Sequence, residues 1–231
     1  MRTIAAMMAA ASGGIVGLEE FIMGNPWDVP PVPERGDDKP EPIYTAVGHA
    51  LSTWELVEEE LASLFALMVG QARRNPETQA AIRAYGSIVS SKARIDMLNA
   101  AAKGFFHGWE KPETMESFAN EFTDLMTMIG GWVGRRNDVA HGRVSRRPKR
   151  PDFILMPSLY NSKKNSLSGT PSYAYSSNEI IIFRNQFDMC SAIFRDYWYR
   201  LLDARYPSLR TQLQQEFRRN SPRTPNPSDP Q

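Results

Sequence analysis

The chain has 231 residues, of which 42% are hydrophobic, enough for one sizeable buried core and therefore for one domain. Its 27 Lys and Arg balance 26 Asp and Glu, so the formal charge of +1 excludes a global attraction to nucleic acid or to an anionic membrane. A single cysteine excludes an intramolecular disulfide, and no Cys/His cluster has the spacing of a metal site. We therefore expect a cytoplasmic protein without metal or other cofactor.

Residues 1–42 are predicted to form a flexible N-terminal arm. Six prolines lie among charged residues between positions 24 and 42, a composition that buries too little apolar area to offset the entropy of folding. The alanine-rich apolar stretch before them is too short to span a bilayer, so no membrane association is expected. A translation start at Met23 is an alternative that also fits this pattern. Residues 219–231, with four more prolines, are predicted to form a disordered tail.

Between these ends, residues 43–218 are predicted to form a single helical domain. Apolar residues recur every three or four positions over 43–71, which predicts one long amphipathic helix. A second helix is expected over 75–104, because an N-cap residue, a first-turn proline and an acid stand at its start. A third is expected from residue 112 to the stop that Gly142 offers.

The hydrophobic period changes after the third helix. Three short segments have strand-like composition and predict a small β insertion at about 152–183: residues 153–156, 172–176 and 179–183. Helical spacing returns over 187–202 and ends before Tyr206-Pro207. The predicted fold is mainly α, an antiparallel bundle of four to five helices with a β-hairpin before the last long helix.

The end of the third predicted helix carries polar and ionisable residues that could take part in binding or catalysis. The apolar stripe that reaches Trp132 continues four positions further to Arg136, where an apolar side chain would be expected. A buried guanidinium needs a partner, and the first helix offers three candidates: Glu58, Glu59 and Glu60. The side chains of Arg136 and His141 point about 140° apart on a helix, whereas Asn137 and His141 lie one above the other.

The segment Arg136-Asn137-Asp138-Val139-Ala140-His141 resembles the signature of the HEPN family. Domains of that family are helical bundles with an Arg, a polar residue, three variable positions and a His near the end of a helix. This segment matches at each fixed position, and the predicted helical order agrees over about residues 43–205.

The resemblance implies a metal-independent endoribonuclease that acts as a homodimer, with the motifs of two protomers facing each other. It also implies a place in a toxin or host-defence system, with a cognate antitoxin or other protein partner. Imidazole suits general acid or base catalysis near neutral pH, and the planar fork of an arginine suits phosphate oxygens. Arg136 and His141 are thus the expected catalytic residues, together with Asn137, which would orient the ring or the phosphate. Gly130, Gly131 and Gly134 would let two such helices approach closely, or would only loosen the helix.

A dense basic patch follows the motif directly: Arg143, Arg146, Arg147, Lys149 and Arg150. These side chains are predicted to bind the phosphates that flank the scissile bond of an RNA. The alternative is a solvated loop whose charges only keep the chain soluble.

A non-catalytic interaction module is the alternative to the enzyme. In the module, Arg136 is ion-paired in the core and His141 stabilises the end of its helix. The two hypotheses differ in geometry, because the enzyme needs both side chains accessible in a basic cleft, whereas the module has both buried against Glu58–Glu60. Asp138 would repel phosphate unless its carboxylate is paired or faces away.

Overall fold

The protein is described here by a computed structural model that covers residues 25–28, 31–70, 78–107, 112–158 and 173–207. These ranges contain helices α2 (Glu41–Met68), α3 (Thr78–Gly86), α4 (Ser91–His107), α5 (Pro112–His141) and α6 (Ser177–Arg205). Strands β1 (Arg143–Arg146) and β2 (Phe153–Met156) form an antiparallel hairpin before α6. The predicted fold class, mainly α with a small hairpin before the last long helix, is confirmed.

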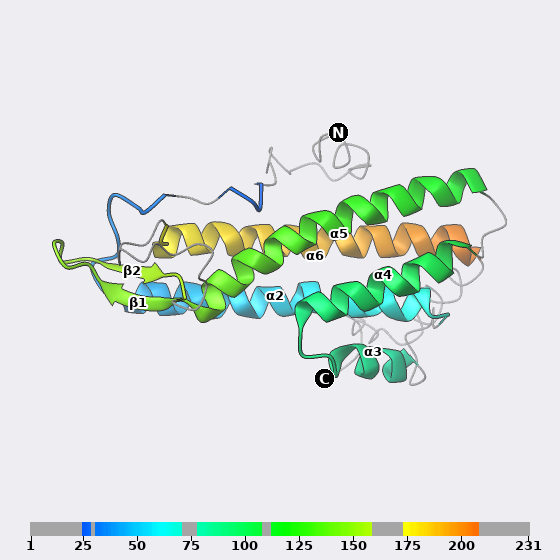
Figure 1. The fold of residues 1–231 in the computed structure, drawn as a ribbon, viewed down its shortest axis with the longest axis horizontal. Helices are drawn as coiled ribbons and strands as arrows, with labels where there is room; N and C mark the ends of the chain where they lie inside the picture. Colours follow the sequence, from blue (N-terminus) through cyan, green and yellow to red (C-terminus); the bar gives the residue numbers. More distant parts are fainter. Residues whose placement is uncertain (1–24, 29–30, 71–77, 108–111, 159–172, 208–231) are drawn as a thin grey trace, which may run out of the picture.

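Three long helices, α2, α5 and α6, form the centre of the bundle (Figure 1). The rings of Trp54 and Phe187 lie 5.0 Å apart, and Arg195 is bonded to Glu60 further along, so α2 and α6 run in the same direction. Helix α5 runs antiparallel to both. α4 lies along α5, and α3 lies on the outer side of α2 (Figure 1).

The core is continuous along these helices because each buries one apolar face. Trp54, Trp132 and Phe187 are almost fully buried where the three long helices meet, and the Trp132 and Phe187 rings are 6.2 Å apart. Edge-to-face aromatic pairs of this kind stabilise a core beyond the area they bury. No helix in the described ranges is long and apolar enough to cross a membrane.

The second predicted helix is wrong in one respect, because the structure has two helices, α3 and α4, where the pattern predicted one. The break follows Gly86, a weak helix former, and the Ser87 hydroxyl donates to the carbonyl of Ala84 at 2.7 Å. The Arg94 Nε donates to the Ile88 carbonyl at 2.7 Å and holds the connection in place. The start predicted at residue 75 lies outside the described residues.

The β insertion also differs from the prediction. Residues 153–156 do form a strand, but their partner is β1, which lies in the basic stretch, so the hairpin spans 143–156 rather than 152–183. The strand predicted at 179–183 is wrong, since these residues form the first turns of α6. A capping box between Ser176 and Glu179 starts this helix and overrides the β-branched run that follows. The strand predicted at 172–176 is reduced, among its described residues, to an isolated β-bridge between Tyr175 and Leu155.

Residues 31–40, which the sequence assigns to a flexible arm, are fastened to the hairpin and to α6. Asp37 exchanges two backbone hydrogen bonds with Phe153, of 2.9 and 2.7 Å. Its carboxylate accepts from the backbone N–H and the hydroxyl of Ser177, at 2.9 and 2.5 Å. A Cβ on Gly36 would lie 2.2 Å from the Phe153 carbonyl oxygen, so only glycine fits there. The predicted tail at 219–231 lies outside the described residues.

An ion pair holds the tip of the hairpin to the same arm. Arg147 donates to Asp152 through Nε at 2.7 Å and again through Nη2. Arg147 also donates to the carbonyls of Pro33 and Glu34, at 2.8 and 3.0 Å. The guanidinium of Arg147 holds the pKa of the Asp152 carboxyl well below its usual range, and the N–H of Gly36 adds to this effect.

This lowered pKa predicts a dependence of stability on pH. Since the pKa is lower in the folded state than in the unfolded state, Asp152 contributes stability above the unfolded value of about 4, and the contribution is lost as pH falls below it. Asp152→Asn should therefore be less stable than wild type by about 2 kcal/mol at pH 6, with a difference that shrinks toward pH 3. Urea denaturation over this pH range measures it. The exposed Asp124→Asn is the control, and a difference for Asp152→Asn that stayed constant with pH would contradict the assignment.

Candidate active site

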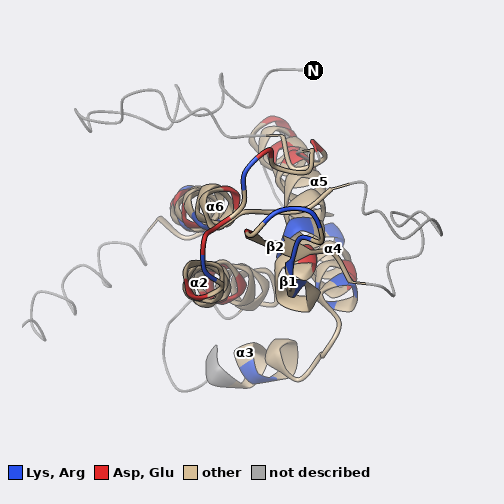
Figure 2. Ribbon diagram, turned by 90° about the vertical axis from the view of Figure 1, so that its left-hand side faces the viewer, with Lys and Arg blue, Asp and Glu red and all other residues tan. Residues whose placement is uncertain are grey.

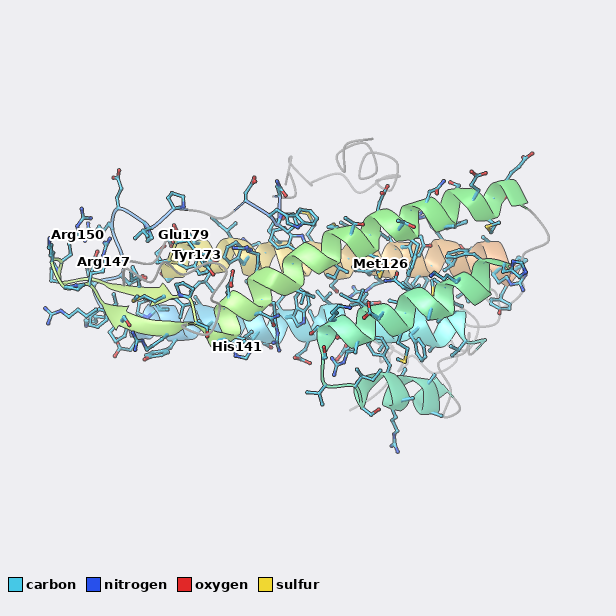
Figure 3. All side chains as sticks on the ribbon, viewed as in Figure 1. Met126, His141, Arg147, Arg150, Tyr173 and Glu179 are labelled. Atoms are coloured by element: carbon cyan, nitrogen blue, oxygen red, sulfur yellow. The ribbon has the colours of Figure 1, made fainter. Side chains whose placement is uncertain are left out.

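The three motif residues lie at the C-terminal end of α5, where the helix passes into the hairpin (Figure 3). His141 is the last residue of the helix and is exposed, as is Asn137 one turn earlier. Arg136 is half-buried, and its Nη1 donates to the side-chain oxygen of Asn137 at 3.2 Å. A Cβ on Gly142 would lie 2.7 Å from Leu155 and 2.9 Å from the Asp138 carbonyl, so glycine lets the chain turn tightly after His141.

The predicted pairing of Arg136 with acids of the first helix is wrong. Glu58 is ion-paired with Arg94 at 2.9 Å, and Glu60 with Arg195 at 2.8 Å. Arg135, rather than Arg136, continues the buried face of α5, with 4% of its surface exposed. The buried face of α5 therefore continues from Trp132 to Arg135, three positions later, and Arg136 lies at the edge of this face.

A buried polar cluster around Arg135 is a feature that the sequence interpretation missed. Arg135 and Asp138 form an ion pair of 3.1 Å whose side chains are 5% and 4% exposed. The hydroxyls of Tyr173 and Tyr175 each donate to this carboxylate at 3.1 Å. Burial, followed by the charge of Asp138, raises the pKa of both tyrosines, which keeps their hydroxyls protonated as donors. The spacing of three residues between Arg135 and Asp138 places both side chains on the same face of a helix, and this spacing could have indicated the ion pair from the sequence.

This cluster determines the electrostatics of the motif. Because Asp138 points into the protein and is neutralised there, its negative charge does not face the surface that carries Asn137 and His141. The condition under which Asp138 is compatible with phosphate binding is therefore met. The accessible motif side chains are a cation, an amide and an imidazole.

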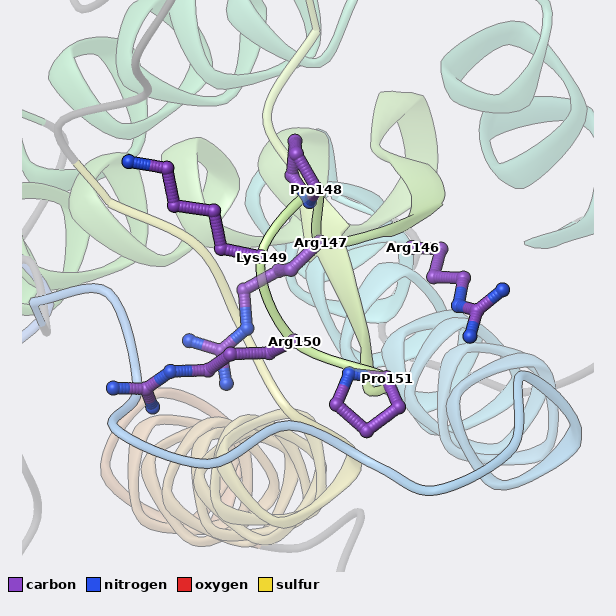
Figure 4. A pocket seen from close by; sticks show the side chains of 6 residues that line it. All are labelled: Arg146, Arg147, Pro148, Lys149, Arg150 and Pro151. Atoms are coloured by element: carbon purple, nitrogen blue, oxygen red, sulfur yellow. The ribbon is translucent and has the colours of Figure 1, made fainter.

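The basic residues after the motif are spread along the hairpin, from its base beside His141 to its tip. Arg143 and Arg146 are exposed on β1, and Lys149 and Arg150 are exposed at the tip of the hairpin. Figure 3 shows Arg147 and Arg150 at the far end of the hairpin and His141 at its base. A shallow hollow of about 460 Å³ at the tip is lined by residues 146–151 (Figure 4).

Two of the three glycines in α5 share an exposed face with the motif. A Cβ on Gly130 or Gly134 would meet no atom within 4 Å. Gly130, Gly134, Asn137 and His141 are separated in turn by four, three and four residues, so all four lie on one side of the helix. Gly131 points elsewhere, because a Cβ there would lie 2.7 Å from the side chain of Pro26.

The remaining histidines, His49 and His107, are exposed on α2 and at the end of α4, outside the motif. In the part of the chain that the structure describes, no group of three or more His, Cys, Asp and Glu side chains could hold a metal ion.

Comparison with known proteins gives no relative. No protein-family model matches the sequence, and no curated protein or solved structure matches it either. The resemblance to the HEPN family therefore depends on the motif residues and the helical order around them.

Proposed function

We propose that this protein is a metal-independent endoribonuclease that acts as a homodimer and uses Arg136, Asn137 and His141. The observation that supports this best is the exposure of His141 beside Asn137 and the accessible part of Arg136, while the carboxylate of Asp138 is turned inward. An imidazole and a guanidinium suit metal-independent cleavage of a phosphodiester, and the carboxylate of Asp138 does not face them.

The proposed reaction is attack of an RNA 2'-oxygen on the adjacent phosphorus, with departure of the 5'-oxygen. A general base takes the proton of the 2'-hydroxyl, and a general acid gives a proton to the leaving oxygen. The products are a 2',3'-cyclic phosphate and a 5'-hydroxyl. Arg136 donates to the non-bridging oxygens, where negative charge accumulates, and Asn137 orients the imidazole of His141 or the phosphate.

The need for both an acid and a base favours a dimer. One chain supplies a single histidine at this site, whereas a two-fold axis beside the end of α5 would bring a second His141 and a second Arg136 close to it. The face with Gly130, Gly134, Asn137 and His141 carries no side chain at its two glycines, and the space beside each is open, so another helix can approach it closely. We propose this face as the dimer contact.

The non-catalytic module has less support. It required Arg136 to be buried against Glu58–Glu60. Among the described residues, Glu58 is instead paired with Arg94 and Glu60 with Arg195. A role in a toxin or host-defence system, with a cognate antitoxin or other protein partner, follows from the resemblance and is proposed on that basis.

The test is cleavage of a mixed RNA pool by the purified protein in EDTA. We expect fragments with 2',3'-cyclic phosphate ends, because intramolecular attack needs no metal-bound water. Fragments with 3'-hydroxyl ends, or cleavage that EDTA abolishes, would contradict the proposed mechanism.

A further inference from the structure

The β-hairpin carries exposed cations at the end of the bundle, away from the motif. Figure 2 shows the bundle from this end, with the basic residues of the hairpin in front of the helices. Arg146, Lys149 and Arg150 are exposed there, and none of them forms an ion pair with a described residue. Arg146 and Lys149 extend to opposite sides of the tip (Figure 4). A strand of nucleic acid that crosses the tip could therefore contact both.

Hydrogen bonds of Arg147 hold the tip against the N-terminal arm. Its guanidinium is occupied by Asp152 and by the carbonyls of Pro33 and Glu34, so it contributes to the position of the tip rather than to its free cations. Arg150 also donates to the Glu34 carbonyl while it stays exposed. A surface fixed before binding loses less entropy when a ligand binds.

The geometry of the hairpin separates the tip from His141. A strand rises about 3.3 Å per residue, so Arg143 and Arg146 are about 10 Å apart along β1, and the turn extends beyond Arg146. The tip therefore lies roughly 15–20 Å from the end of α5. A helically stacked strand carries a phosphate about every 3.4 Å, so roughly five phosphates span this distance.

We propose that Arg146, Lys149 and Arg150 form a phosphate-binding exosite, which holds an RNA strand roughly five nucleotides away from the bond at His141. The position of the bond rests on the function proposed above, whereas the binding of RNA by the tip does not. The exosite makes the protein select substrates by length. RNAs that extend from the motif to the tip bind through both sites, and shorter ones bind through the motif alone.

The test is the binding of fluorescent single-stranded RNAs of about four and about sixteen nucleotides, measured by anisotropy. All proteins carry His141→Ala, so that binding is measured without cleavage. Arg146→Ala/Lys149→Ala removes two tip cations, and Arg83→Ala/Lys103→Ala, at exposed positions on α3 and α4, removes the same charge far from the tip.

We expect the tip variant to bind the longer RNA at least about 10-fold more weakly, and to bind the shorter RNA unchanged. The slope of log K against log salt should fall by about 1.4, or about 0.7 for each lost phosphate contact. The control pair should change neither quantity. An equal loss of affinity for the longer RNA in the two double variants would overturn the exosite. So would the absence of binding of the longer RNA by the His141→Ala parent.

Cleavage of the same RNAs by the chain with His141 intact separates the two proposals. Tip-dependent binding without cleavage would refute the nuclease and leave the exosite as an RNA-binding surface. Cleavage at rates that do not depend on RNA length or on the tip cations would refute the exosite and support the nuclease.

Discussion

Replacement of His141 by alanine is expected to lower the rate of RNA cleavage by about 100-fold to 10,000-fold, the range that a general acid or base contributes. His141 is exposed at the end of α5, so its removal leaves no buried cavity and should leave the fold intact. The measurement is the single-turnover rate of RNA cleavage in EDTA, with thermal denaturation to verify folding.

His49→Ala is the matched control, because His49 is also an exposed helical histidine but lies outside the motif. It should retain the full rate. A mixture of wild-type and His141→Ala protomers extends the test. If the acid and the base come from the two protomers, only dimers with two intact His141 side chains are active, and the rate falls as the square of the wild-type fraction. An unchanged rate in His141→Ala would exclude the proposed role of this residue.

Replacement of Asp138 by alanine is expected to lower the free energy of unfolding by about 3–5 kcal/mol, which can unfold a marginally stable domain. The substitution leaves the Arg135 guanidinium buried without its ion-pair partner, and it removes the carboxylate to which the Tyr173 and Tyr175 hydroxyls donate. Urea denaturation followed by circular dichroism measures the loss.

Two further variants test the cause of this loss. Asp124→Ala, at an exposed position on the same helix, should change the free energy of unfolding by less than about 0.5 kcal/mol. Arg135→Met/Asp138→Leu removes both charges together and should be more stable than Asp138→Ala, because no buried charge is left alone. A double variant as unstable as Asp138→Ala would show that packing volume, not charge, accounts for the effect.

The fold could be predicted from the sequence where local signals agree. The helix from residue 112 to His141 was predicted correctly because a proline near its start, a glycine after its end and an apolar stripe indicate the same element. β1 could not be predicted, because Arg143–Arg146 has little strand propensity and is a strand only through its pairing with β2. The helical start at Ser176 was predictable, but the run of isoleucines after it favoured a strand.

The site was predictable in part for a similar reason. The position of the motif at the end of a helix follows from local sequence, whereas the neighbours of each side chain do not. A stripe with spacings of three and four fits either Arg135 or Arg136, and only tertiary contacts decide between them. Those contacts come from distant segments, as in the bond from Tyr175 to Asp138, and no single-sequence pattern specifies them.

The attachment of the N-terminal arm has a consequence for the order of folding. Asp37 bonds to a residue 140 positions later in the chain, and Arg147 bonds to Pro33 across 114 positions. Contacts of such high contact order form late, because the intervening loop must first be closed at an entropic cost. During synthesis, the start of α6 must leave the ribosome before Asp37 can bind it. The arm therefore reaches its final position against α6 only after Ser177 has left the ribosome, when the earlier helices have had time to form.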